Sequence, residues 1–160
     1  GKNYYSLLST LCDNALVYHE TLNTENAHAS AKLYLNPGAE FLKHLQDFVN
    51  MRTGVVVPYI YELHAKENEG HNCSSCEGQC SFKHAAKLIA IRESQEQIKE
   101  KLLKVKQASV HLDNLFPETY TDLREAITRI EGMLSELFYI EESSLVPKIQ
   151  EAQTNINAHN

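Results

Sequence analysis

The sequence contains no tryptophan, and its 160 residues include only six glycines and four prolines. Such scarcity of helix-breaking residues argues against a fold made mainly of turns and short strands. No uninterrupted apolar run approaches the roughly 18 residues needed to cross a bilayer, so we expect no membrane span. The first residues also lack the apolar segment and small-residue cleavage site of a secretion signal, which makes a cytoplasmic protein our expectation.

The chain also lacks an excess of positive charge. Its formal net charge is -6 and its pI is about 5.7. Proteins that bind nucleic acid usually present a basic face, so this balance argues against nucleic acid as a partner. The sequence shows no glycine-rich phosphate loop, nucleotide-binding motif or Ser-His-Asp pattern, and we therefore expect a non-enzymatic protein, without excluding an enzyme. A homodimer or another protein partner stays open.

What the sequence does contain is helical periodicity. Apolar residues recur at alternating spacings of three and four, a pattern typical of amphipathic helices. Four segments show it, at about residues 3–22, 36–68, 81–109 and 117–153. Four such helices predict an all-α, antiparallel up-down-up-down four-helix bundle. We expect it to form a single domain over residues 1–160, with a cysteine-rich connection at 69–81.

Prolines mark two expected helix starts and one irregularity. Asn36 followed by Pro37 suits a cap and a first turn, so we expect the second helix to begin there. Pro117 has the same role in the last helix. Gly54 and Pro58 lie inside the second segment, and a proline there removes a hydrogen bond and crowds the preceding turn. We therefore expect a kink near these two residues.

One acidic residue interrupts the apolar stripe of the last helix. Glu141 lies four residues after Leu137 and four before Leu145, and Pro147 follows it by six residues. An unpaired carboxylate in a protein core costs several kcal/mol. The helix must therefore either turn Glu141 toward solvent or provide it with a buried partner.

The segment DLREAITRIEGMLSELFYIEESSLVP resembles the hemerythrin-like domains, in particular the di-iron proteins that repair damaged iron–sulfur clusters. In that family a helix carries His-x-x-x-Glu followed by a short apolar run and a proline. Glu141 matches the glutamate, residues 145–147 match the ending, and Leu137 stands where the histidine is expected. The resemblance implies a pseudo-twofold four-helix bundle built from two related hairpins.

The stretch FVNMRTGVVVP resembles a second copy of this motif. It places Phe48 at the histidine position, Arg52 at the glutamate position and Pro58 at the ending. A di-iron site in such a bundle needs imidazole and carboxylate ligands that converge between the helices. Because apolar or cationic residues occupy these positions, we expect the di-iron centre to be absent.

We expect Arg52 to face Glu141 across the bundle, with His84 and either Tyr139 or Gln95 nearby. Arginine suits this site because its planar fork can bond a carboxylate twice. The chain would then be a hemerythrin-like bundle that acts in binding, sensing or regulation. Two alternatives stay open. Glu141 reaches solvent, or an unrecognised ligand set makes the chain a working non-heme iron protein in oxygen, nitric oxide or iron handling.

Three of the four cysteines lie close together in the stretch HNCSSCEGQCSFKH. They are Cys73, Cys76 and Cys80, with His71 before them and His84 after them. Thiolates at this spacing can reach one tetrahedral zinc ion, with either histidine as the fourth ligand, which would make the chain a zinc- or thiol-dependent regulator. An iron–sulfur cluster, a Cys73–Cys76 dithiol and a polar loop with free or disulfide-bonded thiols are the alternatives.

Overall fold

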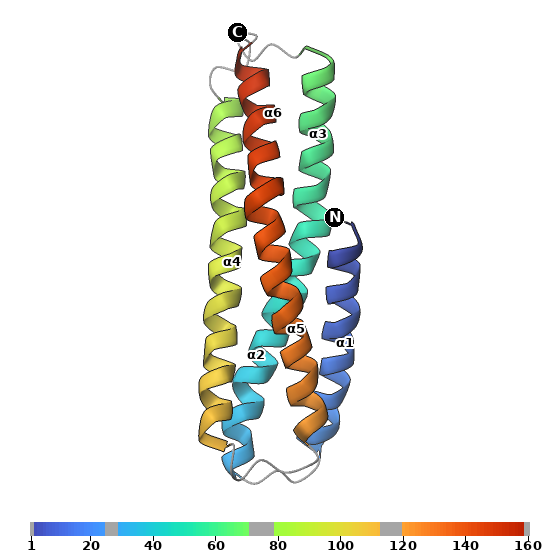
Figure 1. Ribbon diagram of the computed structural model, residues 1–160, viewed down its shortest axis with the longest axis vertical. Helices are drawn as coiled ribbons and strands as arrows, with labels where there is room; N and C mark the ends of the chain where they lie inside the picture. Colours follow the sequence, from blue (N-terminus) through green and yellow to red (C-terminus); the bar gives the residue numbers. More distant parts are fainter. Residues whose placement is uncertain (1, 25–28, 71–78, 113–119, 159–160) are drawn as a thin grey trace. The chain divides into compact units, whose positions relative to one another are not determined.

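The computed structural model describes residues 2–24, 29–70, 79–112 and 120–158, and within these ranges the chain is all-α, without strands (Figure 1). Four long helical stretches account for the fold, which confirms the predicted all-α class. They are α1 (Lys2–Thr24), the continuous α2 (Ala29–Met51), η1 (Arg52–Val56) and α3 (Val57–Asn68), then α4 (Gln79–Leu112), and the continuous α5 (Thr121–Ile140), η4 (Glu141–Leu145) and α6 (Val146–Ala158). None of the helices in the described ranges is long and apolar enough to cross a membrane.

The second helical stretch begins earlier than the sequence predicts. α2 starts at Ala29, so Pro37 lies inside the helix and the expected start at Asn36 is wrong. A proline inside a helix leaves the carbonyl four residues earlier without its usual partner. Burial of Tyr34 and Leu35, each 1% exposed, offsets this loss. Helices in proteins are stabilised more by packing of an apolar face than by local propensity.

The third helix also begins earlier than expected. α4 starts at Gln79, so residues 79–81 are helical and do not belong to the cysteine-rich connection. The preceding helical stretch ends near Gly70, which has a φ of 64° and donates its amide to the carbonyl of Glu67 at 3.3 Å. Glycine adopts this left-handed conformation without steric cost and commonly ends helices.

A π-helical turn precedes Pro58. η1 covers Arg52–Val56, and the amide of Val57 donates to the carbonyl of Arg52, five residues earlier. This wider turn gives the proline ring room where an α-turn would crowd the carbonyl before it. The irregularity expected near Gly54 and Pro58 is therefore a π-turn within a continuous helix.

A second π-turn has the same relation to Pro147. η4 covers Glu141–Leu145, and the amide of Val146 donates to the carbonyl of Glu141. A π-turn holds more residues than an α-turn, so the next inward position after Glu141 moves one residue along the chain. Val146 is 2% exposed, whereas Leu145 is only half-buried, and the predicted continuation of the buried stripe at Leu145 is therefore wrong.

The chain divides into two compact units. Unit 1 consists of Gly1–Val49 and Glu96–Glu136, which include α1, most of α2, the second half of α4 and most of α5. Four helical segments thus contribute to this unit. Its buried side chains are mainly aliphatic and aromatic, and they include Leu8, Ala15, Leu22, Tyr34, Leu35, Phe41, Leu42, Leu45, Phe48, Ile98, Val105, Leu123, Ile127, Ile130 and Leu134.

Unit 2 consists of Asn50–Gln95 and Leu137–Asn160. Three helical segments form it: η1 with α3, the first half of α4, and η4 with α6. α3 packs against α6. The apolar core of this unit comprises Val56, Tyr59, Leu63, Ile91, Val146, Ile149 and Ile156. The same unit contains the polar groups that form the candidate site.

Candidate functional site

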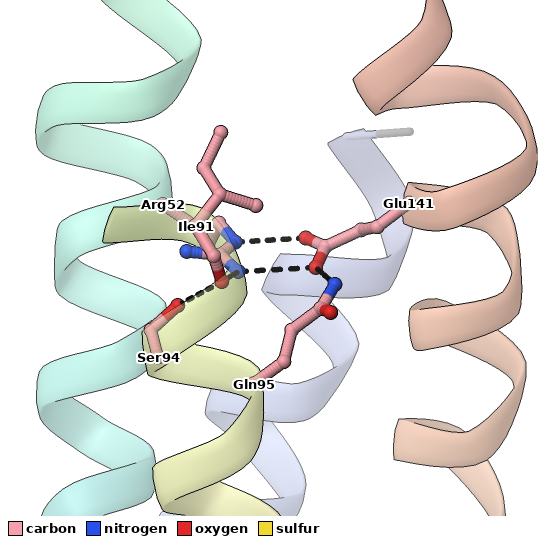
Figure 2. A network of polar contacts seen from close by, with 5 residues as sticks. All are labelled: Arg52, Ile91, Ser94, Gln95 and Glu141. Atoms are coloured by element: carbon pink, nitrogen blue, oxygen red, sulfur yellow. Dashed lines mark hydrogen bonds and ion pairs between the residues drawn. The ribbon is translucent and has the colours of Figure 1, made fainter. Parts of the chain in front are cut away.

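Arg52 and Glu141 form a buried ion pair in unit 2. Each side chain is 1% exposed, so the alternative in which Glu141 reaches solvent does not hold. Arg52 Nε donates to Glu141 Oε2 at 2.8 Å, and Arg52 Nη2 donates to Glu141 Oε1 at 3.1 Å (Figure 2). Two hydrogen bonds between a planar guanidinium and a carboxylate fix the orientation of both groups and compensate their charges.

Gln95 and the backbone of α4 complete this site. Gln95 is 3% exposed and donates its Nε2 to Glu141 Oε1 at 2.8 Å. Arg52 Nη2 also donates to the carbonyl of Ile91 at 3.2 Å, and the same carbonyl accepts a hydrogen bond from Ser94 Oγ at 2.6 Å (Figure 2). Polar groups on the three helical segments of unit 2 are thereby joined in one buried network.

The two π-turns begin at the two charges. Arg52 is the first residue of η1 and Glu141 is the first residue of η4. Each is followed six residues later by a proline, Pro58 or Pro147. The spacing from charge to proline is visible in the sequence, and it is the signal from which the second π-turn could have been predicted. Such turns often occur at functional sites.

The residues present do not fit a di-iron centre of the hemerythrin type. Phe48 and Leu137, at the positions where histidines are expected, are apolar side chains with 3% and 2% exposure. Arg52 brings a positive charge where a carboxylate ligand would be, and it already occupies both oxygens of Glu141. Among the side chains that the structure describes, no three of His, Cys, Asp or Glu are grouped to hold a metal ion.

His84 belongs to a second polar cluster of unit 2. Its Nδ1 lies 2.5 Å from Tyr59 Oη, and the two atoms share one hydrogen bond. Gln153 Nε2 donates to Tyr59 Oη at 3.0 Å and to the carbonyl of His84 at 3.3 Å. The hydrogen bonds of His84 therefore join it to this cluster, whereas the sequence had grouped it with Arg52 and Glu141.

The imidazole of His84 is buried with one nitrogen unsatisfied. The residue is 4% exposed, and its Nε2 has no hydrogen-bond partner among the described atoms. Burial lowers the pKa of His84, the nearby Lys66 and Lys83 lower it further, and Glu62 has the opposite effect. A histidine whose pKa is lowered from its usual value is neutral at pH 7.

The remaining predicted residues lie elsewhere. Tyr139 is 74% exposed, so its expected place beside Glu141 is wrong and Gln95 is the neighbour. Of the candidate metal ligands in the cysteine-rich segment, Cys80 lies in the first turn of α4, where only its backbone is described. The others, His71, Cys73 and Cys76, lie outside the described residues.

Two polar side chains buried in unit 1 have ordinary structural partners. Cys12 is 1% exposed and donates its thiol to the carbonyl of Leu42 at 3.3 Å. Burial raises the pKa of this thiol to about 12, which keeps it unreactive because only the thiolate is a nucleophile. His19 Nε2 donates to the carbonyl of Leu35 at 2.8 Å.

Comparison of the chain with protein-family models, curated proteins and solved structures found no match. Its function is therefore inferred from the ion pair, the His84 cluster and their surroundings.

Proposed function

We propose that this chain is a hemerythrin-like bundle in which the Arg52–Glu141 pair replaces the di-iron centre, and that it acts in binding, sensing or regulation. The observation that carries the proposal is the bidentate contact of Arg52 with a carboxylate that the family would use as a metal ligand. The guanidinium supplies the positive charge that a metal would otherwise provide. With its oxygens occupied by Arg52 and Gln95, Glu141 stabilises the core and does not act as a catalytic acid or base.

The paired π-turns support this proposal. Phe48-x-x-x-Arg52 and Leu137-x-x-x-Glu141 each end at the first residue of a π-turn, and each is followed by a proline at the same distance. Duplication of one ancestral helix hairpin would give both stretches the same local geometry. The likeness therefore extends from the quoted motifs to the backbone that they form.

Metal analysis of the purified protein tests the proposal. After expression in iron-supplemented medium, we expect well under one equivalent of iron or manganese per chain and no near-ultraviolet absorption of an oxo-bridged iron pair. Glu141→Ala removes the candidate ligand, and Glu142→Ala, at the exposed neighbouring position, is its matched control. About two equivalents of iron that Glu141→Ala loses and Glu142→Ala keeps would refute the proposal.

The unsatisfied nitrogen of His84 favours a second candidate, zinc binding by the cysteine-rich segment. A metal-binding histidine usually has its other ring nitrogen held by a hydrogen bond, as Tyr59 holds Nδ1 of His84. Such a site would make the chain a zinc- or thiol-dependent regulator. The proposed ligands are Cys73, Cys76 and Cys80, with His84 or His71 as the fourth.

Zinc release by a thiol-modifying reagent tests this second candidate. We expect about one equivalent of zinc per chain, released as the thiols react. Cys76→Ser should abolish binding, whereas Cys12→Ser, which changes a thiol buried in unit 1, should leave it intact. Protein that contains no zinc after incubation with an equimolar amount would exclude the site.

A further inference from the structure

Unit 2 has a groove of about 320 Å³ between α3 and α6. Its floor is apolar, because Leu63 and Ile149 are each 2% exposed, and Ile60, Leu145 and Ala152 are partly buried beside them. The unit contains three helical segments, and none of them covers this groove. Partly buried apolar side chains along an open groove are typical of a surface that binds another molecule.

The α6 edge of this groove carries two opposite charges one helical turn apart. Lys148 and Glu151 are exposed and line the groove, and among the described residues neither has an ion-pair or hydrogen-bond partner. Glu67, on the α3 edge, is already engaged, because Asn155 Nδ2 donates to its Oε2 at 3.1 Å. Tyr61, on the α3 edge, is 57% exposed, and exposed tyrosines are enriched at protein interfaces.

We propose that this groove is the interface through which two copies of the chain form a symmetric dimer. When two α6 helices meet antiparallel about a two-fold axis midway between Lys148 and Glu151, each lysine lies level with Glu151 of the partner subunit. One symmetric contact then forms two equal ion pairs. A partner with a single dominant charge would leave one of the two side chains beside a like charge, so the edge is best matched by a second copy.

The charges and the floor of the groove have different roles in this dimer. Residues three apart in a helix are separated by about 4.5 Å along its axis, so the two ion pairs are close enough to fix the register of α6 against its counterpart. Ala152, which is only partly buried, directly follows Glu151 on α6 and would be covered by the contact. Further burial of the partly buried side chains Ile60, Leu145 and Ala152 provides the affinity, and the rim charges provide orientation and specificity.

Charge exchange combined with sedimentation equilibrium tests the proposal. Lys148→Glu puts like charges in both pairs, and Glu151→Lys does the same with the opposite sign. Each single variant is expected to raise the dimer Kd about tenfold or more. The double variant Lys148→Glu/Glu151→Lys rebuilds both pairs in reverse and is expected to return the Kd to within about threefold of the parent value.

Lys43→Glu is the matched control, because Lys43 is an exposed lysine of α2 in unit 1. It changes the net charge by the same amount as Lys148→Glu and is expected to leave the dimer Kd unchanged. Far-ultraviolet circular dichroism checks that every variant is folded. A parent protein that stays monomeric up to about 1 mM overturns the proposal. The proposal is also overturned if the double variant has a dimer Kd as high as those of the single variants. A dimer whose Kd no charge change affects overturns it as well.

Discussion

Arg52 and Glu141 are stable in the core of unit 2 because each compensates the charge of the other. Transfer of an isolated ion from water to a protein interior costs several kcal/mol, and their close contact and the hydrogen bond from Gln95 offset this cost. Removal of one partner leaves a buried charge uncompensated, whereas removal of both leaves no buried charge at the site. The effects of substituting these two residues should therefore be strongly non-additive.

Substitution of Arg52 and Glu141 singly and together measures this coupling. Arg52→Met should lower the free energy of unfolding by about 3–5 kcal/mol because Glu141 is left unpaired. Glu141→Leu should cost a similar amount for the converse reason. The double variant should lose less than either single variant, and urea denaturation of the four proteins gives the coupling energy.

Arg92→Met is the control for this set, because Arg92 is exposed on α4. We expect it to change the free energy of unfolding by less than about 0.5 kcal/mol. Additive losses in the double variant would mean that the two buried charges do not compensate each other.

For individual residues, the sequence predicts that Glu141 needs a buried partner. It does not predict which other side chains lie beside that pair. An acid on an apolar stripe requires compensation, and the resemblance of FVNMRTGVVVP to a second copy of the motif indicated Arg52 as the partner. The choice between Tyr139 and Gln95 depends on helix rotation. Tyr139 precedes Glu141 by two residues, which is about 200° around the helix, so its side chain points outward. The contact of His84 with Tyr59 depends on how α3 rotates after the π-turn, which the periodicity does not specify.

His84 should make stability depend on pH. Its folded pKa is lowered, chiefly by burial, so below the ordinary value of about 6.5 the unfolded chain binds the proton more readily. The contribution of this residue to the free energy of unfolding is thus fully present above about pH 7 and is lost as the pH falls through the folded pKa. In urea denaturation between about pH 7.5 and 5, His84→Gln should show a smaller slope than the parent. Equal slopes would contradict the lowered pKa.

Among the elements, the four helical stretches could be predicted because their periodicity is a local property of the sequence. The start of α2 could not, because the local signal at Asn36–Pro37 is outweighed by burial of Tyr34 and Leu35 in unit 1. The π-turns shift the buried stripe, and an unbroken period of 3.6 residues does not anticipate this shift. Their position depends on the prolines that follow them.

Three consecutive valines test the register that η1 imposes. Val56 is 4% exposed, whereas Val55 and Val57 are half-buried. Threonine has nearly the volume of valine but adds a hydroxyl, so Val56→Thr should lower the free energy of unfolding by about 1–3 kcal/mol. The same change at the other two positions should cost less, as judged by urea denaturation. A larger loss at Val55, where an unbroken α-helical stripe places the core, would contradict the π-helical register.

For the whole molecule, burial of polar side chains is concentrated in one unit. Of the buried polar or charged residues in the described chain, Arg52, His84, Gln95 and Glu141 lie in unit 2, and His19 lies in unit 1. Composition and periodicity predict the all-α class, but they do not show where one core ends and another begins. They also do not reveal the groove between α3 and α6, since an amphipathic stripe has the same pattern whether or not another helix covers it.

Diffraction at the iron absorption edge, from crystals of the protein soaked in excess ferrous iron, is the most direct test of the proposal that an arginine replaces a metal centre. The expected result is an Arg52–Glu141 contact that keeps its distances of 2.8 Å and 3.1 Å. No anomalous peak should appear within about 2.5 Å of the carboxylate oxygens, the range of metal–oxygen bonds. An iron peak at Glu141 with the guanidinium displaced would contradict the replacement.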